Sequence, residues 1–250
     1  EVGRRLEQAC AATLKRTSME LGGNAPFIVF EDADIDAAVA GALISKYRNS
    51  GQTCVCTNRI LVHESIHDGF VEKLVAATRE LKLGDGREEG VQQGPLVNEG
   101  AVQDVARLVE QSTAAGAVVA LGGQRADLGP CYYQPTVLTG VTPDMAVFRN
   151  EIFGPVAPVT TFRDEAEAVA LANDTEFGLA SYFYTRDIGR VWRVAEALDY
   201  GMVGVNEGII SNEMAPFGGV KASGSGREGS KYGIDDYLEI KYVLMGGLDR

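Results

Sequence analysis

Cysteine and histidine are scarce in this chain, which has four Cys and two His among its 250 residues. The cysteines, Cys10, Cys54, Cys56 and Cys131, are too few and too irregularly spaced for a disulfide framework in a chain of this length. Their spacing is not that of a zinc site either. We therefore expect free thiols and no bound metal.

Basic side chains and long apolar runs are also in short supply. The chain has 23 Lys and Arg against 35 Asp and Glu, so its formal net charge is −12. Nucleic-acid binders need clustered Lys and Arg, so nucleic acid and anionic membranes are poor partners. No run approaches the roughly 20 apolar residues that cross a bilayer, and the opening EVGRRL holds no signal core. We expect a cytoplasmic protein.

The sequence instead contains short apolar runs that alternate with amphipathic segments. A helix predicted at 34–49, with Asp34 as its cap, lies between strands predicted at 26–30 and 58–64. The alternation continues with helices at about 65–81 and 99–115, a strand at 117–121, a strand at 156–162, a helix at 164–173, a strand at 180–185, a helix at 187–198 and a strand at 201–206. This pattern favours an α/β fold with a mostly parallel sheet flanked by helices.

The segment 237–245, YLEIKYVLM, alternates like a strand but has no later helix to cover it. A terminal strand of this kind often pairs with another subunit, so we interpret it as an oligomerisation strand.

Two motif matches occur in unfavourable contexts. His63 to His67 fits the H-E-x-x-H zinc pattern, but His63 ends a predicted strand and Ser65 resembles the cap of the next helix, so the imidazoles should not converge. Gly224 to Gly229 fits G-x-G-x-x-G, but it follows a loop rather than a strand, and we interpret it as a flexible connection.

Two segments carry groups suited to catalysis. Cys54 lies in a small polar loop between a helix end and a strand, where a thiol is either a nucleophile or an inert small side chain. Glu20 ends a short extended run and is followed by Gly22 and Gly23, which allow a close backbone approach. A strand and a helix separate Glu20 from Cys54, which lets the chain double back and place both in one cleft.

Two further segments put an acid or an aromatic residue at a turn: Glu151 to Pro155, EIFGP, and Pro216 to Lys221, PFGGVK. Each is weak alone. Together the four segments resemble the aldehyde dehydrogenase superfamily, with ELGG at Glu20, GQxC at Cys54, EIFGP at Glu151 and PFGGxKxSGxGRE at 216–228. Within that family, the stretches 19–26, 51–56, 206–211 and 226–235 are most similar to the succinate-semialdehyde dehydrogenases.

The resemblance implies the chemistry. Cys54 would attack the aldehyde to form a thiohemiacetal, hydride transfer to NAD or NADP would leave a thioester, and Glu20 would activate the hydrolytic water. The backbone amide of Cys54 would stabilise the oxyanion. The implied reaction is oxidation of succinate semialdehyde to succinate by a homodimer or homotetramer.

The resemblance also implies binding roles. Glu151 would hold the nicotinamide ribose and Phe153 would pack beside the nicotinamide, with Leu21 and Gly22 also at the cofactor. Arg48 would bind the far carboxylate of the substrate, because a guanidinium grips a carboxylate in bidentate fashion; its alternative role is a cation at a helix terminus. The remaining substrate residues would be Ser211, as a hydroxyl partner, and Phe217, in the aldehyde channel.

Cys56 lies two residues beyond Cys54. A disulfide between them would switch the enzyme off under oxidation, although so short a ring is strained. Alternatively, Cys56 simply begins the next strand.

Members of the family that it resembles are roughly twice as long, and we expect the remaining half to be the amino-terminal part. We divide the chain into a remnant of the dinucleotide-binding domain at 1–22, a catalytic domain at 23–222 and a C-terminal segment at 223–250. Two interpretations remain: the catalytic part of a dehydrogenase, or a folded remnant that binds or assembles without turnover. The sequence leaves open NAD against NADP, and succinate semialdehyde against glutarate semialdehyde.

Overall fold

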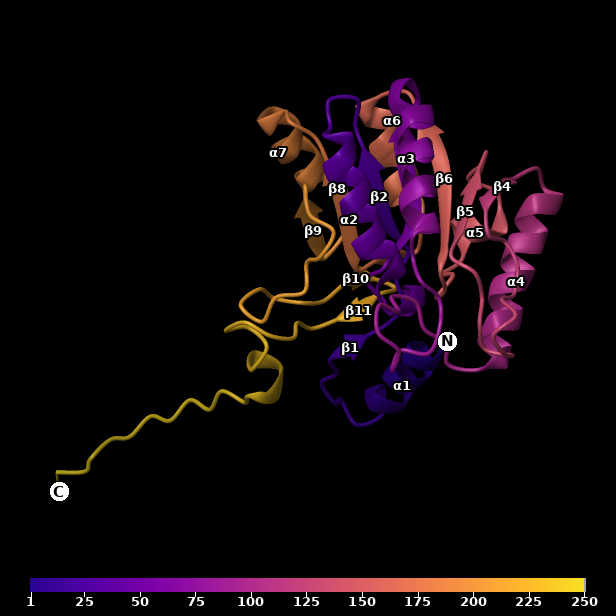
Figure 1. Cartoon of the computed structure of the whole chain (residues 1–250). Coiled ribbons are helices and arrows are strands. Elements are labelled where there is room, and N and C mark those ends of the chain that lie inside the picture. The colour runs from indigo at the N-terminus through magenta and orange to yellow at the C-terminus, as the bar shows by residue number, and fades with distance from the viewer. Residues whose placement is uncertain (250) are drawn as a thin grey trace.

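A seven-stranded sheet forms the centre of this computed structural model, which describes residues 1–249 (Figure 1). The strand order is β4-β5-β6-β3-β2-β8-β9, and every neighbouring pair is parallel except β4 and β5. The strands are β2 (Ala25–Val29), β3 (Thr57–His63), β4 (Val118–Leu121), β5 (Thr136–Thr139), β6 (Val156–Phe162), β8 (Ala180–Tyr184) and β9 (Met202–Val205). The α/β prediction with a mostly parallel sheet is confirmed.

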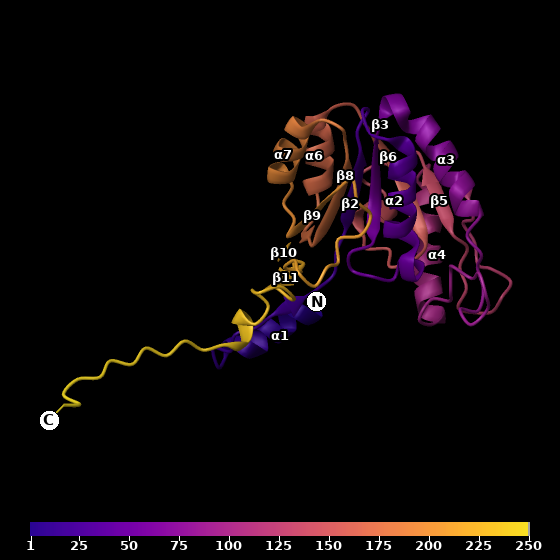
Figure 2. The same cartoon turned by 60° about the vertical axis from the view of Figure 1, so that its left-hand side comes forward.

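Helices cover both faces of the sheet (Figures 1 and 2). One face is covered by α2 (Ile35–Tyr47) and α3 (His67–Arg79). The other is covered by α4 (Glu99–Ala114), α5 (Ala146–Arg149), α6 (Glu165–Asn173) and α7 (Ile188–Ala197). The sheet is buried on both faces, as a parallel sheet requires.

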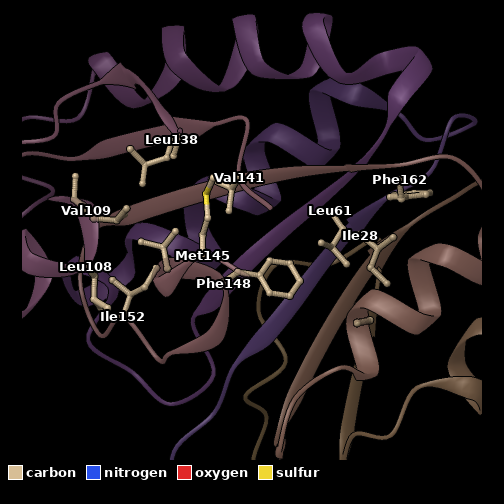
Figure 3. Close-up of a cluster of buried hydrophobic side chains, with 14 of the residues drawn as sticks. Ile28, Leu61, Leu108, Val109, Leu138, Val141, Met145, Phe148, Ile152 and Phe162 are labelled. Carbon is tan, nitrogen blue, oxygen red and sulfur yellow. The ribbon is translucent and has the colours of Figure 1, made fainter. Parts of the chain in front are cut away.

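The alternation of side chains along each strand divides the core into two clusters. In β2, Phe27 and Val29 pack toward α2 and α3, whereas Ile28 packs into the opposite cluster. That second cluster also receives Leu61 of β3 and Phe148 of α5 (Figure 3). Because successive side chains of a strand point to opposite faces, a slip of one residue would exchange the two clusters.

Aspartate and asparagine side chains set where the helices begin. Asp34 accepts a hydrogen bond from the backbone N–H of Ala37 at 3.1 Å, which confirms its predicted capping role. Asn98, Asp164 and Asp187 do the same for α4, α6 and α7. Such caps satisfy backbone donors that have no partner inside the helix.

Two small antiparallel pairs lie at one end of the main sheet, near α1 (Val2–Ala11) (Figure 2). They are β1 (Met19–Glu20) with β11 (Gly224–Ser225), and β7 (Phe177–Gly178) with β10 (Val220–Lys221). The G-x-G-x-x-G match at 224–229 therefore begins in a strand paired with β1 and has no helix directly after it. The β1–β11 pair thus connects the segment that holds Glu20 with the C-terminal part of the chain.

Some elements differ from the prediction. β5 and α5 were not expected, and the helix predicted at about 65–81 is divided into a 3-10 turn, η2 (Glu64–Ile66), and α3. The cap of η2 is the side chain of His63, which accepts from the backbone N–H of Ser65 at 3.3 Å, so Ser65 is not the cap.

The C-terminal segment extends away from the body of the chain (Figure 1). A short 3-10 turn, η3, covers Asp235–Tyr237, and residues 238–249 have no regular secondary structure. The strand predicted at 237–245 is thus not formed within this chain. A strand forms only when it pairs with a neighbouring strand, and this segment pairs with none in the described part of the chain. Its pairing with a second copy stays a prediction. No helix among residues 1–249 is long and apolar enough to span a membrane.

Candidate active site

Three of the four motif segments precede parallel strands that are adjacent in the sheet. Gly23 comes just before β2, Cys54 just before β3, and Glu151 shortly before β6. Parallel strands begin at the same edge of a sheet, so these three segments lie together. Open α/β sheets usually bind ligands at the carboxyl ends of the strands; in this chain the motifs meet at the amino ends.

The two glycines after Glu20 and Leu21 make the close approach that the sequence predicted. A Cβ atom at Gly23 would lie 2.4 Å from the backbone oxygen of Cys54, and one at Gly22 would lie 2.7 Å from Oε2 of Glu151. The backbone N–H of Gly23 donates to Oε1 of Glu151 at 3.0 Å. The ELGG segment therefore contacts both of its neighbours through backbone atoms that a side chain would block.

The carboxylate of Glu20 is buried beside the motif segments without a partner in the described part of the chain. Both of its oxygens are buried and have no hydrogen-bond partner within residues 1–249. The pKa of Glu20 is raised from 4.5 to about 7, mainly by burial and also by the charge of Glu228, while the charge of Arg227 lowers it. Position 218 of the PFGG segment is close as well, because a Cβ at Gly218 would lie 3.1 Å from Oε1 of Glu20. The acid of the first motif segment thus lies against the last one.

Cys54 is a free, partly buried thiol. Burial raises its pKa above the ordinary value, and the carboxylate of Glu20 raises it further. The backbone N–H of Cys54 faces its own sulfur and lowers the pKa. The charge of Glu20 therefore acts on the thiol of Cys54, and the segments that hold them meet at the amino ends of β2 and β3.

Arg48 is exposed and follows the last residue of α2. Its charge, like those of Cys54 and Cys56, acts on the buried hydroxyl of Tyr182, whose pKa is raised mainly by burial. That hydroxyl donates to the backbone oxygen of Val55 at 2.8 Å. The hydroxyl of Tyr182 is therefore bonded to the residue directly after Cys54, in the loop that begins at Arg48.

An amide network that the sequence analysis missed joins three of the segments. The buried side chain of Asn58 donates to Oδ1 of Asn24 at 2.6 Å and to the backbone oxygen of Asn150 at 2.8 Å. Its own Oδ1 accepts from the backbone N–H of Ile152 at 2.9 Å. The only sequence signal was two asparagines next to strands, which is too common to single out.

The residues predicted to contact the cofactor line two cavities. Leu21 and Gly22 line one of about 300 Å³, together with Glu176 and Phe177. Glu151 and Phe153 line another of about 390 Å³ beside α4. Phe153 is 44% exposed and has a left-handed backbone with φ of 51°, which turns the chain after Glu151.

The predicted substrate residues are only partly brought together. Phe217 packs on the same core cluster as Cys54 and lines a cavity of about 390 Å³ with Ile209 and Ile210. Its backbone is held by a mutual pair of hydrogen bonds with Glu228, at 2.9 and 2.7 Å. Ser211 is exposed in the same loop.

The imidazoles of the H-E-x-x-H match do not converge on a common site. His63 contacts Ser65 and the backbone oxygen of Arg163, whereas Nδ1 of His67 contacts Asp68. Across residues 1–249, no group of three or more His, Cys, Asp or Glu is arranged to hold a metal ion.

Comparison with known proteins shows what the chain is similar to. Residues 1–243 match the Aldehyde dehydrogenase family. Over 248 residues the chain is 59% identical to a glutarate-semialdehyde dehydrogenase of Pseudomonas aeruginosa, covering 99% of this chain and 51% of that protein. It is 61% identical to a 3-sulfolactaldehyde dehydrogenase of Pseudomonas putida, covering 100% and 51%.

The fold agrees with these matches. The crystal structure of a succinate-semialdehyde dehydrogenase from Burkholderia pseudomallei superposes with a TM-score of 0.96 at 63% identity, covering 97% of this chain and 50% of that one. The chain spans about half the length of the curated relatives it matches. Enzymes of this group use NAD or NADP to oxidise small aldehydes. On its motifs, fold and sequence, the chain belongs to the aldehyde dehydrogenase family.

Proposed function

We propose that this chain carries the catalytic centre of a dehydrogenase that oxidises succinate semialdehyde to succinate with NAD or NADP. The observation that supports this most directly is the buried, unpartnered carboxylate of Glu20, whose charge acts on the thiol of Cys54. A carboxylate with a pKa of about 7 is half ionised at neutral pH, which suits a general base.

The reaction begins at the sulfur of Cys54. The thiolate attacks the aldehyde carbon, a C–S bond forms, and the carbonyl oxygen becomes an oxyanion near the backbone N–H of Cys54. Loss of hydride from that carbon restores the carbonyl and leaves a thioester. Glu20 then takes a proton from water as its oxygen attacks the thioester, the C–S bond breaks, and the carboxylic acid leaves.

The residues present fit a nicotinamide cofactor, which when bound would supply the hydride acceptor. Glu151 has one carboxylate oxygen fixed by Gly23, and its second oxygen lies against Gly22, where it can accept hydrogen bonds from ribose hydroxyls. Leu21 and Gly22 form the wall of an adjoining cavity. We propose Phe153 as a packing surface for the nicotinamide ring.

For the substrate, we propose that Arg48 binds the far carboxylate, with Ser211 as its hydroxyl partner and Phe217 along the aldehyde channel. Arg48 is exposed, and its charge acts on the hydroxyl of Tyr182, which donates to Val55 directly after Cys54. A cation at one end and a thiol at the other would select an aldehyde that carries an anion at its far end. The relatives named for glutarate semialdehyde and 3-sulfolactaldehyde act on aldehydes of the same kind. We further propose that the protein is a homodimer or homotetramer in the cytoplasm.

The first experiment measures NAD(P)H formation from succinate semialdehyde. It compares the 250-residue chain with an extended chain, in which the amino-terminal half of a full-length relative is joined upstream. Activity of the extended chain that Cys54→Ala abolishes would support the proposal. If the extended chain oxidises only glutarate semialdehyde or 3-sulfolactaldehyde, the proposed substrate is wrong, whereas the proposed reaction at Cys54 is still supported.

A second experiment isolates the catalytic pair from the cofactor. Hydrolysis of 4-nitrophenyl acetate requires acyl transfer to Cys54 and water attack on the thioester, but no hydride transfer. The 250-residue chain should release 4-nitrophenolate continuously, Glu20→Gln should give a single burst without turnover, and Cys54→Ala should give neither. No release by either the 250-residue or the extended chain would favour an inactive remnant.

A further inference from the structure

The backbone between Arg48 and Cys54 forms a left-handed turn. Asn49 has φ and ψ of 52° and 33°, Ser50 has 55° and 32°, and Gly51 has φ of 76°. Left-handed backbone is unfavourable for residues other than glycine, so such a turn persists only where its surroundings hold it. Because the turn separates Arg48 from Cys54, its shape sets the distance between the two groups.

The side chain of Gln93 holds the start of this turn. Helix α2 ends at Tyr47 because Arg48 leaves the helical conformation with ψ of 133°, so the carbonyl of Tyr47 has no donor inside the helix. Nε2 of Gln93 donates to that carbonyl at 2.7 Å, and Gln93 is only 2% exposed. Tyr47 is itself anchored, since its hydroxyl donates to the backbone oxygen of Thr136 at 2.8 Å.

The rest of the turn contacts residues 94–97, directly after Gln93. The hydroxyl of Ser50 donates to the backbone oxygen of Gly94 at 3.0 Å. Oε1 of Gln52 accepts from the backbone N–H of Val97 at 2.8 Å. The beginning, middle and end of the turn are therefore all bonded to one segment of chain.

The backbone of Gln93 is fixed independently of the turn. Its N–H donates to the oxygen of Lys82 at 3.1 Å, and its own oxygen accepts from Gly84 at 2.9 Å. The side chain thus reaches the turn from a rigid support. Its Oε1 is buried and has no partner within the described part of the chain. An apolar side chain would avoid that cost, so packing alone does not account for an amide at this position.

We propose that Gln93 is a positioning residue that sets the preference of the enzyme for aldehydes bearing an anionic group. By holding the carbonyl of Tyr47, Gln93 fixes the direction in which Arg48 leaves the helix, and so places the guanidinium at the correct distance from Cys54. This inference rests on the proposed function, because it requires Arg48 to bind the far end of the substrate.

The test compares two four-carbon aldehydes in the extended chain: succinate semialdehyde and butanal, which lacks the carboxylate. Gln93→Leu removes the amide donor and puts an apolar side chain of similar size in its place. We expect its KM for succinate semialdehyde to rise about tenfold, as the loss of one well-aligned charge contact would give. Its KM for butanal and its kcat for both aldehydes should stay within about twofold.

Gln92→Leu is the matched control. Gln92 is the adjacent glutamine and is exposed; its Oε1 accepts from the backbone N–H of Lys82 at 3.3 Å. Its backbone oxygen accepts from Nε2 of Gln93 at 3.0 Å, a contact that does not depend on the side chain at position 92. Its substitution should leave both KM values unchanged. Ser50→Ala removes the hydrogen bond to Gly94, in the segment directly after Gln93. It should raise the KM for succinate semialdehyde about threefold and leave the KM for butanal unchanged. This variant replaces Gln93→Leu in the test if Gln93→Leu does not fold.

A second measurement needs neither cofactor nor turnover. Succinate bound at Arg48 should slow the alkylation of Cys54 by iodoacetamide in the parent and in Gln92→Leu, but not in Gln93→Leu. The positioning role would be overturned if Gln93→Leu lost activity toward both aldehydes alike. It would also be overturned if succinate protected Cys54 of Gln93→Leu as well as it protects Cys54 of the parent. If Arg48→Leu also fails to raise the KM for succinate semialdehyde relative to that for butanal, the proposed function is wrong instead.

Discussion

The backbone of Gly23 lies directly against the backbone carbonyl of Cys54, so that a Cβ atom at position 23 would be 2.4 Å from that oxygen. Gly23→Ala must therefore push the Cys54 turn away from β2. Because displacements of about 1 Å are enough to lower catalysis about a hundredfold, we expect a loss of kcat of that order in the extended chain. We also expect unfolding in urea to become easier by about 1–3 kcal/mol.

Gly69→Ala is the control for this substitution. Gly69 lies in α3, and nothing would contact an added Cβ there within 4 Å. Alanine at that position should leave kcat unchanged and stabilise the helix by up to about 1 kcal/mol. Equal effects of the two substitutions would mean that the contact between Gly23 and Cys54 does not matter.

The raised pKa of Glu20 makes stability depend on pH. Its pKa is about 7 in the folded chain and 4.5 as the ordinary value, so the folded state binds this proton more tightly. The stabilising contribution is complete below pH 4.5 and is lost as the pH rises through about 7. Glu20→Gln should therefore raise the Tm at pH 8, by about 2–4 °C per kcal/mol recovered, and change it little at pH 5.

Thermal unfolding at the two pH values measures this difference, with Glu196→Gln at an exposed position of α7 as the control. A Glu20→Gln variant whose Tm shifts equally at both pH values would show that ionisation of the carboxyl is not the cause.

The second thiol, two residues after Cys54, allows a test of redox control. Sγ of Cys56 accepts from the hydroxyl of Thr53 at 2.9 Å and lies 3.7 Å from the backbone oxygen of Arg48. A disulfide with Cys54 would break both contacts. We expect peroxide to abolish activity, a thiol reductant to restore it, and the peptide holding both cysteines to lose the mass of two hydrogens. The Cys56→Ser variant should not show that mass change; lasting inactivation of the parent would rule out the switch.

The C-terminal segment allows a test of assembly. Ile240 is 100% exposed and Leu244 is 81% exposed in a stretch without a partner in the described chain. Exposed apolar side chains in a row mark an interaction surface. Deletion of residues 238–250 should lower the molar mass measured by light scattering to that of a monomer. A parent chain that is already monomeric at micromolar concentration would contradict the predicted pairing.

The elements predicted correctly are those specified by local sequence. The strand predicted at 156–162 is β6, which has those bounds because a long apolar run with β-branched residues lies between clear breaks. The helices that begin after Asp34, Asp164 and Asp187 carry their capping signal in the chain itself. The sequence does not predict β5, because its four residues become a strand through pairing with β4 and β6, which no local pattern encodes.

The candidate site divides in the same way. The close approach at Gly22 and Gly23 is predictable, because two consecutive glycines after an acid leave the backbone bare where any side chain would keep a neighbour away. The role of Gln93 is not predictable, since it depends on a contact with Tyr47, which is 46 positions away in the sequence. Hydrogen bonds between distant segments leave no periodic signal, so only the folded structure identifies such residues.

The side chain of Asn58 joins the segments of Asn24, Asn150 and Ile152 through three hydrogen bonds. The strand that follows Cys54 is therefore mechanically coupled to the segments that follow Glu20 and flank Glu151. Free-energy changes caused by substitutions in these segments should not be additive, because each substitution alters the support of the other two. A substitution in one of these segments should thus change the effect of a substitution in the other two, although the three are distant in sequence.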